Sequence, residues 1–382
     1  MLKGFEGDGE KTVKQIYEFL NHPAFTNPIS IMPDCHVGKG AVIGFTMKLT
    51  DKVIPNVIGV DIGCGMLSCN FKNILLDHVA SLEEFDERIR EKIPFSTNVN
   101  EKFEPIPIPF YTAVNKKIKD FQTKFNNEFK TEFKIPVVNE EWLKNKCKEI
   151  NMDYERTVKS LGTLGGGNHF IEVGIGNDDN FWITIHSGSR QFGLKIAEYH
   201  QNKAGKEVLA YLEDEDMFSY LVDMVVAQTY ADFNRIFMLN EITWITEIFP
   251  LERITSVHNY IDFHDFIIRK GAISSYKNEK MIIPFNMEDG ILICEGKSND
   301  EWNFSAPHGA GRVDSRRWAK KNLNLDEAKK RMTEKGIYSS MIPIDETKGA
   351  YKDPKTIEDS IGPTAEIVDR IKPILSCKGK GK

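Results

Sequence analysis

Histidines in small-residue surroundings are the most informative feature of this 382-residue sequence. Five of the nine histidines, with one aspartate and one cysteine, lie in motifs rich in glycine or other small residues: His36, Asp61, Cys64, His169, His186, His258 and His308. Imidazole, thiolate and carboxylate groups bind transition metals, and a thiolate can bridge two ions. Seven such residues exceed the three or four ligands of one zinc ion, which indicates a spare catalytic residue or a second ion. We therefore predict a two-metal site that polarises phosphate oxygens.

Two of these motifs also have a purely structural interpretation. Cys64 follows Asp61 by three residues between glycines. A buried structural cysteine is the alternative there, but the flanking glycines expose the position and favour a metal ligand. Asp34 and His36 lie on the same side of an extended chain, as a carboxylate that orients an imidazole would. The alternative for this pair is a turn that contains a histidine.

Three consecutive glycines, residues 165–167, directly precede Asn168 and His169, with Glu172 shortly after. Glycine lets a backbone approach a ligand closely, so this segment is predicted to contact a substrate, with a flexible turn as the alternative. Further on, an apolar strand is predicted to end at His186. Arg190 follows it with a planar guanidinium suited to phosphate oxygens.

Apolar spacing predicts the elements that must position these residues. Helical spacing covers residues 12–20 and about 217–239, and a strand-turn-strand pattern covers residues 281–296. On the long helix, Asn234 and Arg235 would either reach a phosphate or form a surface salt bridge. Residues 105–110 (PIPIPF) are expected to form a connector without helix.

The run of lysines and phenylalanines over residues 116–134 has two readings. It favours a solvated amphipathic helix over a nucleic-acid face with stacking aromatics. No repeat or linker separates the motifs of the chain, so we expect one domain over residues 1–382 with a single site.

Composition excludes some functional classes. The formal net charge of −6 gives no general affinity for polyanions, although a local basic cleft is compatible with it. Six irregularly spaced cysteines, and a first segment without an apolar run, indicate a reducing cytoplasm with free thiols. No apolar run approaches the roughly 18 residues of a membrane span, so no membrane association is expected.

Eight ordered motifs resemble the signature set of the RtcB family of RNA ligases. They are MPDCHVGKGAVIG, GVDIGCGM, GTLGGGNHFIE, HSGSR, HNY, RKGA, SAPHGAGR and GAYKD. The resemblance implies an α/β (α+β) fold with a central mixed β-structure, peripheral helices and a metal-bearing cleft. It also implies an enzyme that joins an RNA 3′-phosphate, or a 2′,3′-cyclic phosphate after hydrolysis, to a 5′-hydroxyl, using GTP and two Mn²⁺ ions. Such end chemistry serves tRNA splicing or RNA repair.

The resemblance also implies roles for individual residues. One Mn²⁺ would be held by Asp61, Cys64 and His169, and the other by Cys64, His186 and His258. His308 would attack the α-phosphorus of GTP to give a covalent guanylate. The nucleotide would be contacted by Asn168, Glu172, Ala310, Gly311, Tyr351 and Lys378. The RNA terminal phosphate would be bound by Arg190 and Arg312, while Asp34 and His36 would support either the metal site or the RNA end.

Two segments depart from the family pattern. Many members read IPGSMG where this chain has IPFNME (residues 283–288), and a serine that would contact guanine falls on Ile291. At the end of the chain Lys378, Lys380 and Lys382 compete for one role, and Lys378 is favoured because Cys377 aligns with an apolar position. A protein that activates the enzyme is a further expected partner. The alternatives are a metal-dependent phosphoesterase that opens cyclic phosphates without joining RNA, and an RNA-end-binding protein without turnover.

Overall fold

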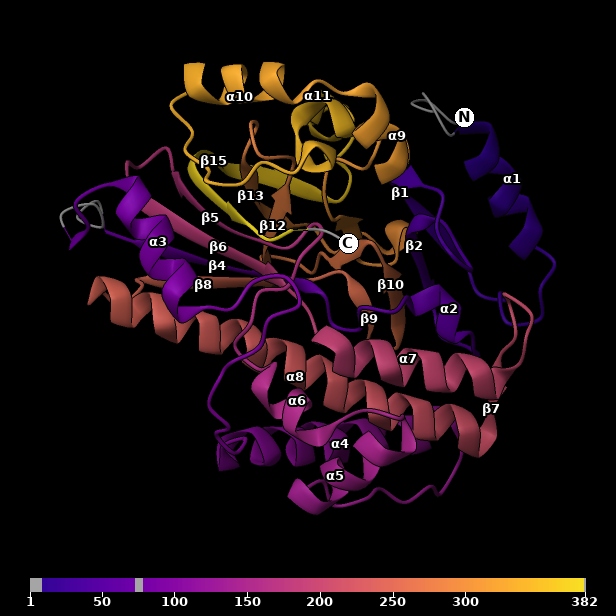
Figure 1. Cartoon of the computed structure of the whole chain (residues 1–382). Helices are drawn as coiled ribbons and strands as arrows, with labels where there is room; N and C mark the ends of the chain where they lie inside the picture. The colour runs from indigo at the N-terminus through magenta and orange to yellow at the C-terminus, as the bar shows by residue number, and fades with distance from the viewer. Residues whose placement is uncertain (1–8, 73–77, 381–382) are drawn as a thin grey trace.

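A seven-stranded antiparallel sheet forms the centre of the computed structural model, which describes residues 9–72 and 78–380 (Figure 1). The strand order is β12-β13-β15-β5-β6-β4-β8. The bounds are β4 Gly65–Phe71, β5 Phe170–Ile175, β6 Phe181–Ser187, β8 Glu252–Val257, β12 Lys280–Pro284, β13 Ile291–Gly296 and β15 Ala365–Lys378. The predicted strand-turn-strand over residues 281–296 is confirmed as β12 and β13.

The sheet curls so that its first and last strands approach each other. The backbone N–H of Ile282 in β12 donates to the hydroxyl of Ser256 in β8 at 2.9 Å. The enclosed face carries an apolar cluster to which all seven strands contribute: Met66, Phe170, Trp182, Ile254, Ile282, Ile291, Ile293 and Ile371. Because side chains alternate across a strand, the next residues along it, such as Leu67 and Ile171, point to the opposite face.

Helices cover that opposite face. α3 (Leu82–Lys92) and the long α8 (Asp214–Thr246) contribute buried side chains that pack on the sheet, among them Phe85, Ile89, Met238, Leu239 and Ile242. The long helix predicted over residues 217–239 is therefore confirmed and extends further at both ends. Against its outer side lie α4 (Ile108–Phe129), α5 (Glu140–Glu149) and α6 (Tyr154–Lys159), whereas α7 (Arg190–Ala204) runs along α8 on the side of α2 (Figure 1).

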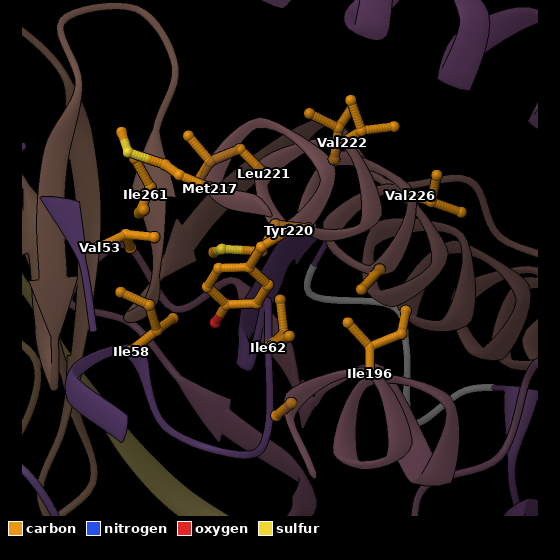
Figure 2. Close-up of a cluster of buried hydrophobic side chains, with 14 of the residues drawn as sticks. Val53, Ile58, Ile62, Ile196, Met217, Tyr220, Leu221, Val222, Val226 and Ile261 are labelled. Atoms are coloured by element: carbon orange, nitrogen blue, oxygen red, sulfur yellow. The ribbon is translucent and has the colours of Figure 1, made fainter. Parts of the chain in front are cut away.

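The largest apolar cluster joins this helical layer to the rest of the molecule. Figure 2 shows Tyr220 of α8 between aliphatic side chains from α7, α8, α2 and the neighbouring loop and strands. The aromatic run of α4 belongs to the same cluster, because Phe121 and Phe125 are buried. The prediction of an amphipathic helix over residues 116–134 is thus confirmed for the part that α4 covers. The alternative of a stacking nucleic-acid face is wrong, because these rings point inward.

One expectation about a single segment is wrong. The connector expected over residues 105–110 ends early, because α4 begins at Ile108, with Pro107 as N-cap and Pro109 in the first turn. Proline is tolerated there because the first turn of a helix has no intrahelical partner for its N–H groups.

Asn234 and Arg235 are buried, so they do not reach a phosphate from the surface. The salt-bridge alternative holds for Arg235, which pairs with the partly exposed Asp232 at 2.6 Å although its own side chain is buried. Arg235 donates to the carbonyls of Gly63 and Ser187, and Asn234 bonds the loop of residues 162–163. The two side chains attach α8 to the segments that carry the predicted metal ligands.

A second, four-stranded antiparallel sheet has the order β1-β2-β10-β9. Its strands are β1 Ile29–His36, β2 Ile43–Lys48, β9 Asn259–Asp262 and β10 Ile267–Lys270. Two short pairs are β3 Lys52–Val53 with β7 Leu212–Glu213, and β11 Ala272–Ser274 with β14 Ser305–Pro307. The remaining α-helices are α1 Gly9–Phe19, α2 Pro55–Ile58, α9 Arg316–Asn322, α10 Leu325–Glu334 and α11 Pro354–Glu358.

The helix predicted over residues 12–20 is confirmed as α1. Three 3-10 helices lie late in the chain: η2 Asp300–Trp302, η3 Ile344–Glu346 and η4 Lys348–Ala350. The expected α/β class with a central sheet and peripheral helices is confirmed. Within the described ranges, no helix is long and apolar enough to cross a membrane.

Candidate active site

Four neighbouring strands of the central sheet bring the predicted metal ligands together at one end. Cys64 directly precedes β4, and the first residue of β4, Gly65, pairs with Ser187 in β6 and Val257 in β8. His186 and His258 are the chain neighbours of those two partners. His169 precedes β5, whose first residue pairs with His186. The strand register therefore brings together residues that lie up to 194 positions apart in the sequence.

The ligand atoms of these residues face one another at short distances. The Cys64 Sγ lies 3.5 Å from the Nε2 of His169 and 3.3 Å from the Nε2 of His186. The Nε2 of His186 lies 3.3 Å from the Nε2 of His258, and the Nε2 of His169 lies 3.0 Å from an Asp61 carboxylate oxygen. Cys64, His169 and His186 are buried and form a group whose geometry is able to hold a metal ion.

The Nδ1 atoms of His169 and His186 bond backbone carbonyls, so the Nε2 atoms of these rings face the ligand cluster. The Nδ1 of His169 bonds the Leu164 carbonyl at 2.9 Å, and the Nδ1 of His186 bonds the Asn168 carbonyl at 3.1 Å. A carbonyl only accepts, so each Nδ1 carries a proton. The Nε2 of His169 faces a carboxylate oxygen, which also only accepts, so that contact needs a proton or a cation between the two atoms. Two imidazoles that face inward beside a sulfur and a carboxylate are an arrangement that a cation stabilises.

Burial favours the uncharged forms of the imidazoles and of the thiol in this cluster. It lowers the pKa of His186 and of His258 well below the usual value, so both rings are neutral and able to act as ligands near pH 7. Burial also raises the pKa of the Cys64 thiol, so the thiolate form requires a nearby positive charge. One carboxylate oxygen of Asp61 is buried without a hydrogen-bond partner. The residues present therefore fit a transition-metal centre.

His308 lies next to this cluster and is paired with a buried carboxylate. Its ring centroid is 5.0 Å from that of His258. Its Nδ1 contacts the Asp34 Oδ2 at 2.5 Å, and its backbone N–H donates to the same oxygen at 3.2 Å. With Nδ1 occupied by Asp34, the ring nitrogen available to a substrate is Nε2.

Asp34 therefore has a different partner from the one that the sequence predicted. Asp34 was predicted to orient the nearby His36, but it orients His308, which is 274 positions away. A bulge in the pairing of β1 with β2, between Ile31 and His36, interrupts the regular alternation there. The ring of His36 bonds the backbone carbonyl of Asp34, and burial lowers its pKa to about 4. No sequence signal connects Asp34 to His308.

A cavity of about 260 Å³ opens beside His308 and extends away from the cluster. Its wall includes the predicted nucleotide and phosphate residues Asn168, Glu172, Ala310, Gly311, Arg312, Tyr351 and Lys378, with His36, His186 and His258. Glu172 and Lys378 come from the paired strands β5 and β15, two residues apart in register. The ammonium of Lys378 lies 5.0 Å from the centroid of the Phe170 ring.

Glu346 and Arg316, which the sequence did not single out, complete this wall. The Glu346 carboxylate is bound by Lys378 at 3.3 Å, by Arg312 at 2.7 Å, by the Tyr351 hydroxyl at 2.6 Å, and by Arg316. Burial by itself would raise the pKa of Glu346, but the three cations outweigh it and lower that pKa to about 2. In the sequence, the available signal for Glu346 was its position five residues before Tyr351. That signal is too weak to single out one residue.

Comparisons with known proteins agree with this geometry. A model of the family described as tRNA-splicing ligase RtcB matches residues 15–379. The chain belongs to the RtcB family. It is 29% identical to the RNA-splicing ligase RtcB of Escherichia coli strain K12, over 96% of this chain and 93% of that protein. It is 24% identical to the tRNA-splicing ligase RtcB of Nanoarchaeum equitans, over 97% of this chain and 92% of that protein.

The last strand of this RtcB-family chain presents Lys378 to the cavity. Lys378 is buried, whereas Lys380 is exposed and its carbonyl accepts from the Ser96 hydroxyl at 3.1 Å. Arg90 donates to the Lys378 carbonyl at 3.2 Å, which fixes the strand from the other side. Of these two lysines, Lys378 lines the cavity and Lys380 does not. Lys382 lies outside the described residues.

Residues 283–288, which depart from the RtcB pattern, are held by an ion pair. Glu288 is buried and receives two 3.0 Å hydrogen bonds from Arg331 of α10. Asn286 lines the cavity, and its side-chain oxygen accepts from the backbone N–H groups of Glu288 and Asp289. Ile291, where a serine was expected, is buried in the cavity wall. The hydrogen-bonding groups at this wall therefore differ from those that the family pattern implies.

The two predicted phosphate arginines already have protein partners. Arg190 bonds the Thr163 hydroxyl at 3.1 Å and the Ser96 carbonyl at 3.0 Å, beneath the glycine loop. A Cβ at Gly165, where φ is +90°, would lie 2.0 Å from that guanidinium, so glycine is required there both by conformation and by space. Arg312 bonds the Asp345 carbonyl as well as Glu346 and Tyr351. Arg312 lines the cavity, whereas Arg190 supports the loop from below.

Glu172 gives this site a pH-dependent stability. Burial raises its pKa to about 8, only partly offset by the charge of Lys378. A carboxyl whose folded pKa exceeds its unfolded value stabilises the fold below the unfolded pKa, and this contribution is lost as pH rises through the folded pKa. We therefore expect the wild type to lose stability relative to Glu172→Gln between about pH 4.5 and pH 8, by roughly 1.4 kcal/mol per unit. Urea unfolding of both proteins across this range measures the difference, and parallel pH profiles would contradict it.

Proposed function

We propose that this protein is a GTP- and Mn²⁺-dependent RNA ligase that joins 3′-phosphate or 2′,3′-cyclic phosphate ends to 5′-hydroxyl ends. Membership of the RtcB family and relatives named as RNA-splicing ligases support the RNA ligase activity. The observation that carries the proposal is the position of His308. Its ring lies 5.0 Å from that of His258 in the cluster and lines the cavity with the buried charged groups, and Asp34 occupies its Nδ1.

The metal residues divide into two sets that share a sulfur. Asp61, Cys64 and His169 would hold one Mn²⁺, and Cys64, His186 and His258 would hold the second. When bound, the two ions supply charge that polarises phosphate oxygens and stabilises the attacking and leaving oxygens. The backbone carbonyls on His169 and His186 hold both rings in the tautomer that this role needs.

His308 would act as the nucleophile. Asp34 accepts the Nδ1–H of His308 and so keeps the Nε2 lone pair directed to the cavity. Nε2 would form a bond to the α-phosphorus of GTP while the bond to the β-phosphate oxygen breaks and pyrophosphate leaves. The guanylate would then pass to an oxygen of the RNA 3′-phosphate, which frees His308. Attack by the 5′-hydroxyl on that terminal phosphorus forms the new phosphodiester and expels GMP.

The cavity residues would bind the purine. Glu172 has one oxygen that is buried without a partner and faces Lys378 across the paired strands, so it offers an acceptor to the N–H groups of guanine. Lys378 offers a donor to the guanine carbonyl. Asn168 would contact the nucleotide phosphates, with Ala310 and Gly311 beside the ribose. Tyr351 closes the pocket from the opposite side.

The RNA end would occupy the His308 side of the cavity. Arg312 is the candidate for its terminal phosphate, with Arg190 and His36 in supporting positions. Asp34 acts through His308 instead. tRNA halves or cleaved RNAs with the same ends are the substrate class, and an activating protein partner belongs to the same proposal. The six cysteines are all buried and free, which fits the proposed cytoplasmic location.

Protein labelling by GTP tests the proposal. Incubation with α-labelled GTP and Mn²⁺ should give an acid-labile protein adduct in the wild type and none in His308→Ala. His264→Ala is the matched control, because His264 is an exposed histidine outside the cavity. If wild type and His308→Ala are indistinguishable, the proposed mechanism is wrong. Conversion of cyclic phosphate ends to 3′-phosphate ends, without adduct or joined RNA, would instead identify a phosphoesterase.

A further inference from the structure

The carboxylate of Glu346 joins two pairs of side chains in the cavity wall. One oxygen, Oε1, accepts from the guanidinium of Arg312 at 2.7 Å and from that of Arg316. The other oxygen, Oε2, accepts from the Tyr351 hydroxyl at 2.6 Å and from the Lys378 ammonium at 3.3 Å. Glu346 therefore links the two arginines to two residues of the proposed purine pocket.

The position of this carboxylate is closely fixed. Glu346 is the last residue of η3, and its backbone N–H donates to the Pro343 carbonyl at 2.9 Å. Its side chain is buried, and the Arg312 guanidinium also lies over the Tyr351 ring, 4.6 Å from the ring centroid. Because both oxygens are occupied and water is excluded, the carboxylate holds its partners in one arrangement.

The ammonium of Lys378 needs a nearby negative charge. Burial lowers the pKa of Lys378, and the charge of Glu346 counters this effect more than that of Glu172 does. Burial raises the pKa of Glu172 to about 8, so Glu172 is largely uncharged near pH 7. The pKa of Glu346 is lowered to about 2, so its carboxylate stays ionised. Glu346 therefore supplies the charge that keeps Lys378 protonated.

A protonated lysine distinguishes the two purine bases. Guanine carries an acceptor, O6, at the position where adenine carries a donor, the N6 amino group. The ammonium of Lys378 has three donors and no acceptor, so it bonds O6 but faces a second donor when adenine is present. A site built to bond one polar group rejects an analogue that leaves the site unpaired.

We propose that Glu346 is a positioning residue that sets the preference for guanine over adenine by holding Lys378 against the base. This inference rests on the proposed function, because it takes the cavity to bind a guanine nucleotide. The oxygens of Glu346 are occupied by four side chains of the cavity wall, so Glu346 acts through Lys378 and not on the base itself.

Nucleotide binding by Glu346→Gln tests the inference. Calorimetric titration of the folded full-length protein with GMP, IMP and AMP, with Mn²⁺ present throughout, gives three Kd values. IMP keeps the O6 of guanine but lacks its 2-amino group. The affinity ratio of GMP to AMP therefore reports the contact with Lys378, and the ratio of GMP to IMP reports the contact with the 2-amino group. Asp345→Asn is the matched control, because Asp345 is also buried in η3 but its carboxylate pairs with Arg316 at 3.0 Å.

We expect Glu346→Gln to lower the GMP to AMP ratio about thirtyfold and to leave the GMP to IMP ratio within about twofold of the wild type. Asp345→Asn should keep both ratios. If Glu346→Gln does not fold, Glu346→Asp decides the question. It keeps the charge but withdraws the carboxylate by one methylene, so it should lower the GMP to AMP ratio about fivefold.

Three results would overturn the inference: a wild-type GMP to AMP ratio in the folded Glu346 variant, a loss of both ratios together, or an equal loss in Asp345→Asn. A purely structural role for Glu346 would weaken the binding of all three nucleotides and leave the ratios unchanged. A wild type that binds GMP no better than AMP would overturn the guanine pocket of the proposed function as well.

Discussion

Cys64→Ser is expected to lose bound metal and to lower RNA joining more than about a hundredfold. The sulfur lies 3.5 Å from the Nε2 of His169 and 3.3 Å from the Nε2 of His186, so its loss removes a ligand from both proposed ions at once. A serine hydroxyl stays protonated near pH 7 and is a poor ligand for a soft cation. Elemental analysis of the purified variants, with a joining assay, measures both effects.

A variant of a second buried cysteine, Cys69, distinguishes a loss of metal from a loss of packing. Cys69 lies in β4, the strand that Cys64 directly precedes, in the apolar cluster on the opposite face of the sheet. Cys69→Ala should therefore reduce stability but keep the metal content of the folded protein. If Cys64→Ser kept its metal and its activity, Cys64 would be a packing residue and the two-ion site would be wrong.

Asp34→Asn is expected to slow adduct formation on the order of a thousandfold. The carboxylate accepts the Nδ1–H of His308 at 2.5 Å, which leaves the Nε2 lone pair for the nucleotide. An asparagine amide can donate to Nδ1 instead, and this favours the tautomer with its proton on Nε2, which cannot attack phosphorus. Single-turnover labelling with α-labelled GTP measures the rate.

Metal content distinguishes positioning from a loss of structure. Asp34 lies outside the ligand cluster, so Asp34→Asn should retain its metal. A rate within a few-fold of the wild type would show that the contact between Asp34 and His308 does not serve the reaction.

The sequence was most informative for residues that have glycines nearby and lie at the end of a strand. Cys64, His169, His186 and His258 each lie at or next to the end of an apolar strand, so the prediction that they converge followed from local pattern. The antiparallel register then places them in one row, and that register was not predictable without the pairing of distant strands. Their role as ligands is part of the proposal above.

Charged groups whose partners are distant in sequence were not predictable. The pairing of Asp34 with His308, the burial of Arg235 and the bond from Arg331 to Glu288 all depend on contacts across 43 positions or more. Composition and periodicity describe one segment at a time, so they cannot choose among possible partners. The lysine-rich α4 shows the reverse case, because its amphipathic spacing alone shows which way its phenylalanines point.

The source of the phosphate in the joined product tests the central claim most directly. An RNA with a radiolabelled 3′-terminal phosphate is incubated with a 5′-hydroxyl RNA, GTP, Mn²⁺ and the wild-type protein. The account predicts a longer RNA in which the label becomes resistant to phosphatase, with one GMP released for each joint. Label that stays on the unjoined RNA, or appears as free phosphate, would contradict it.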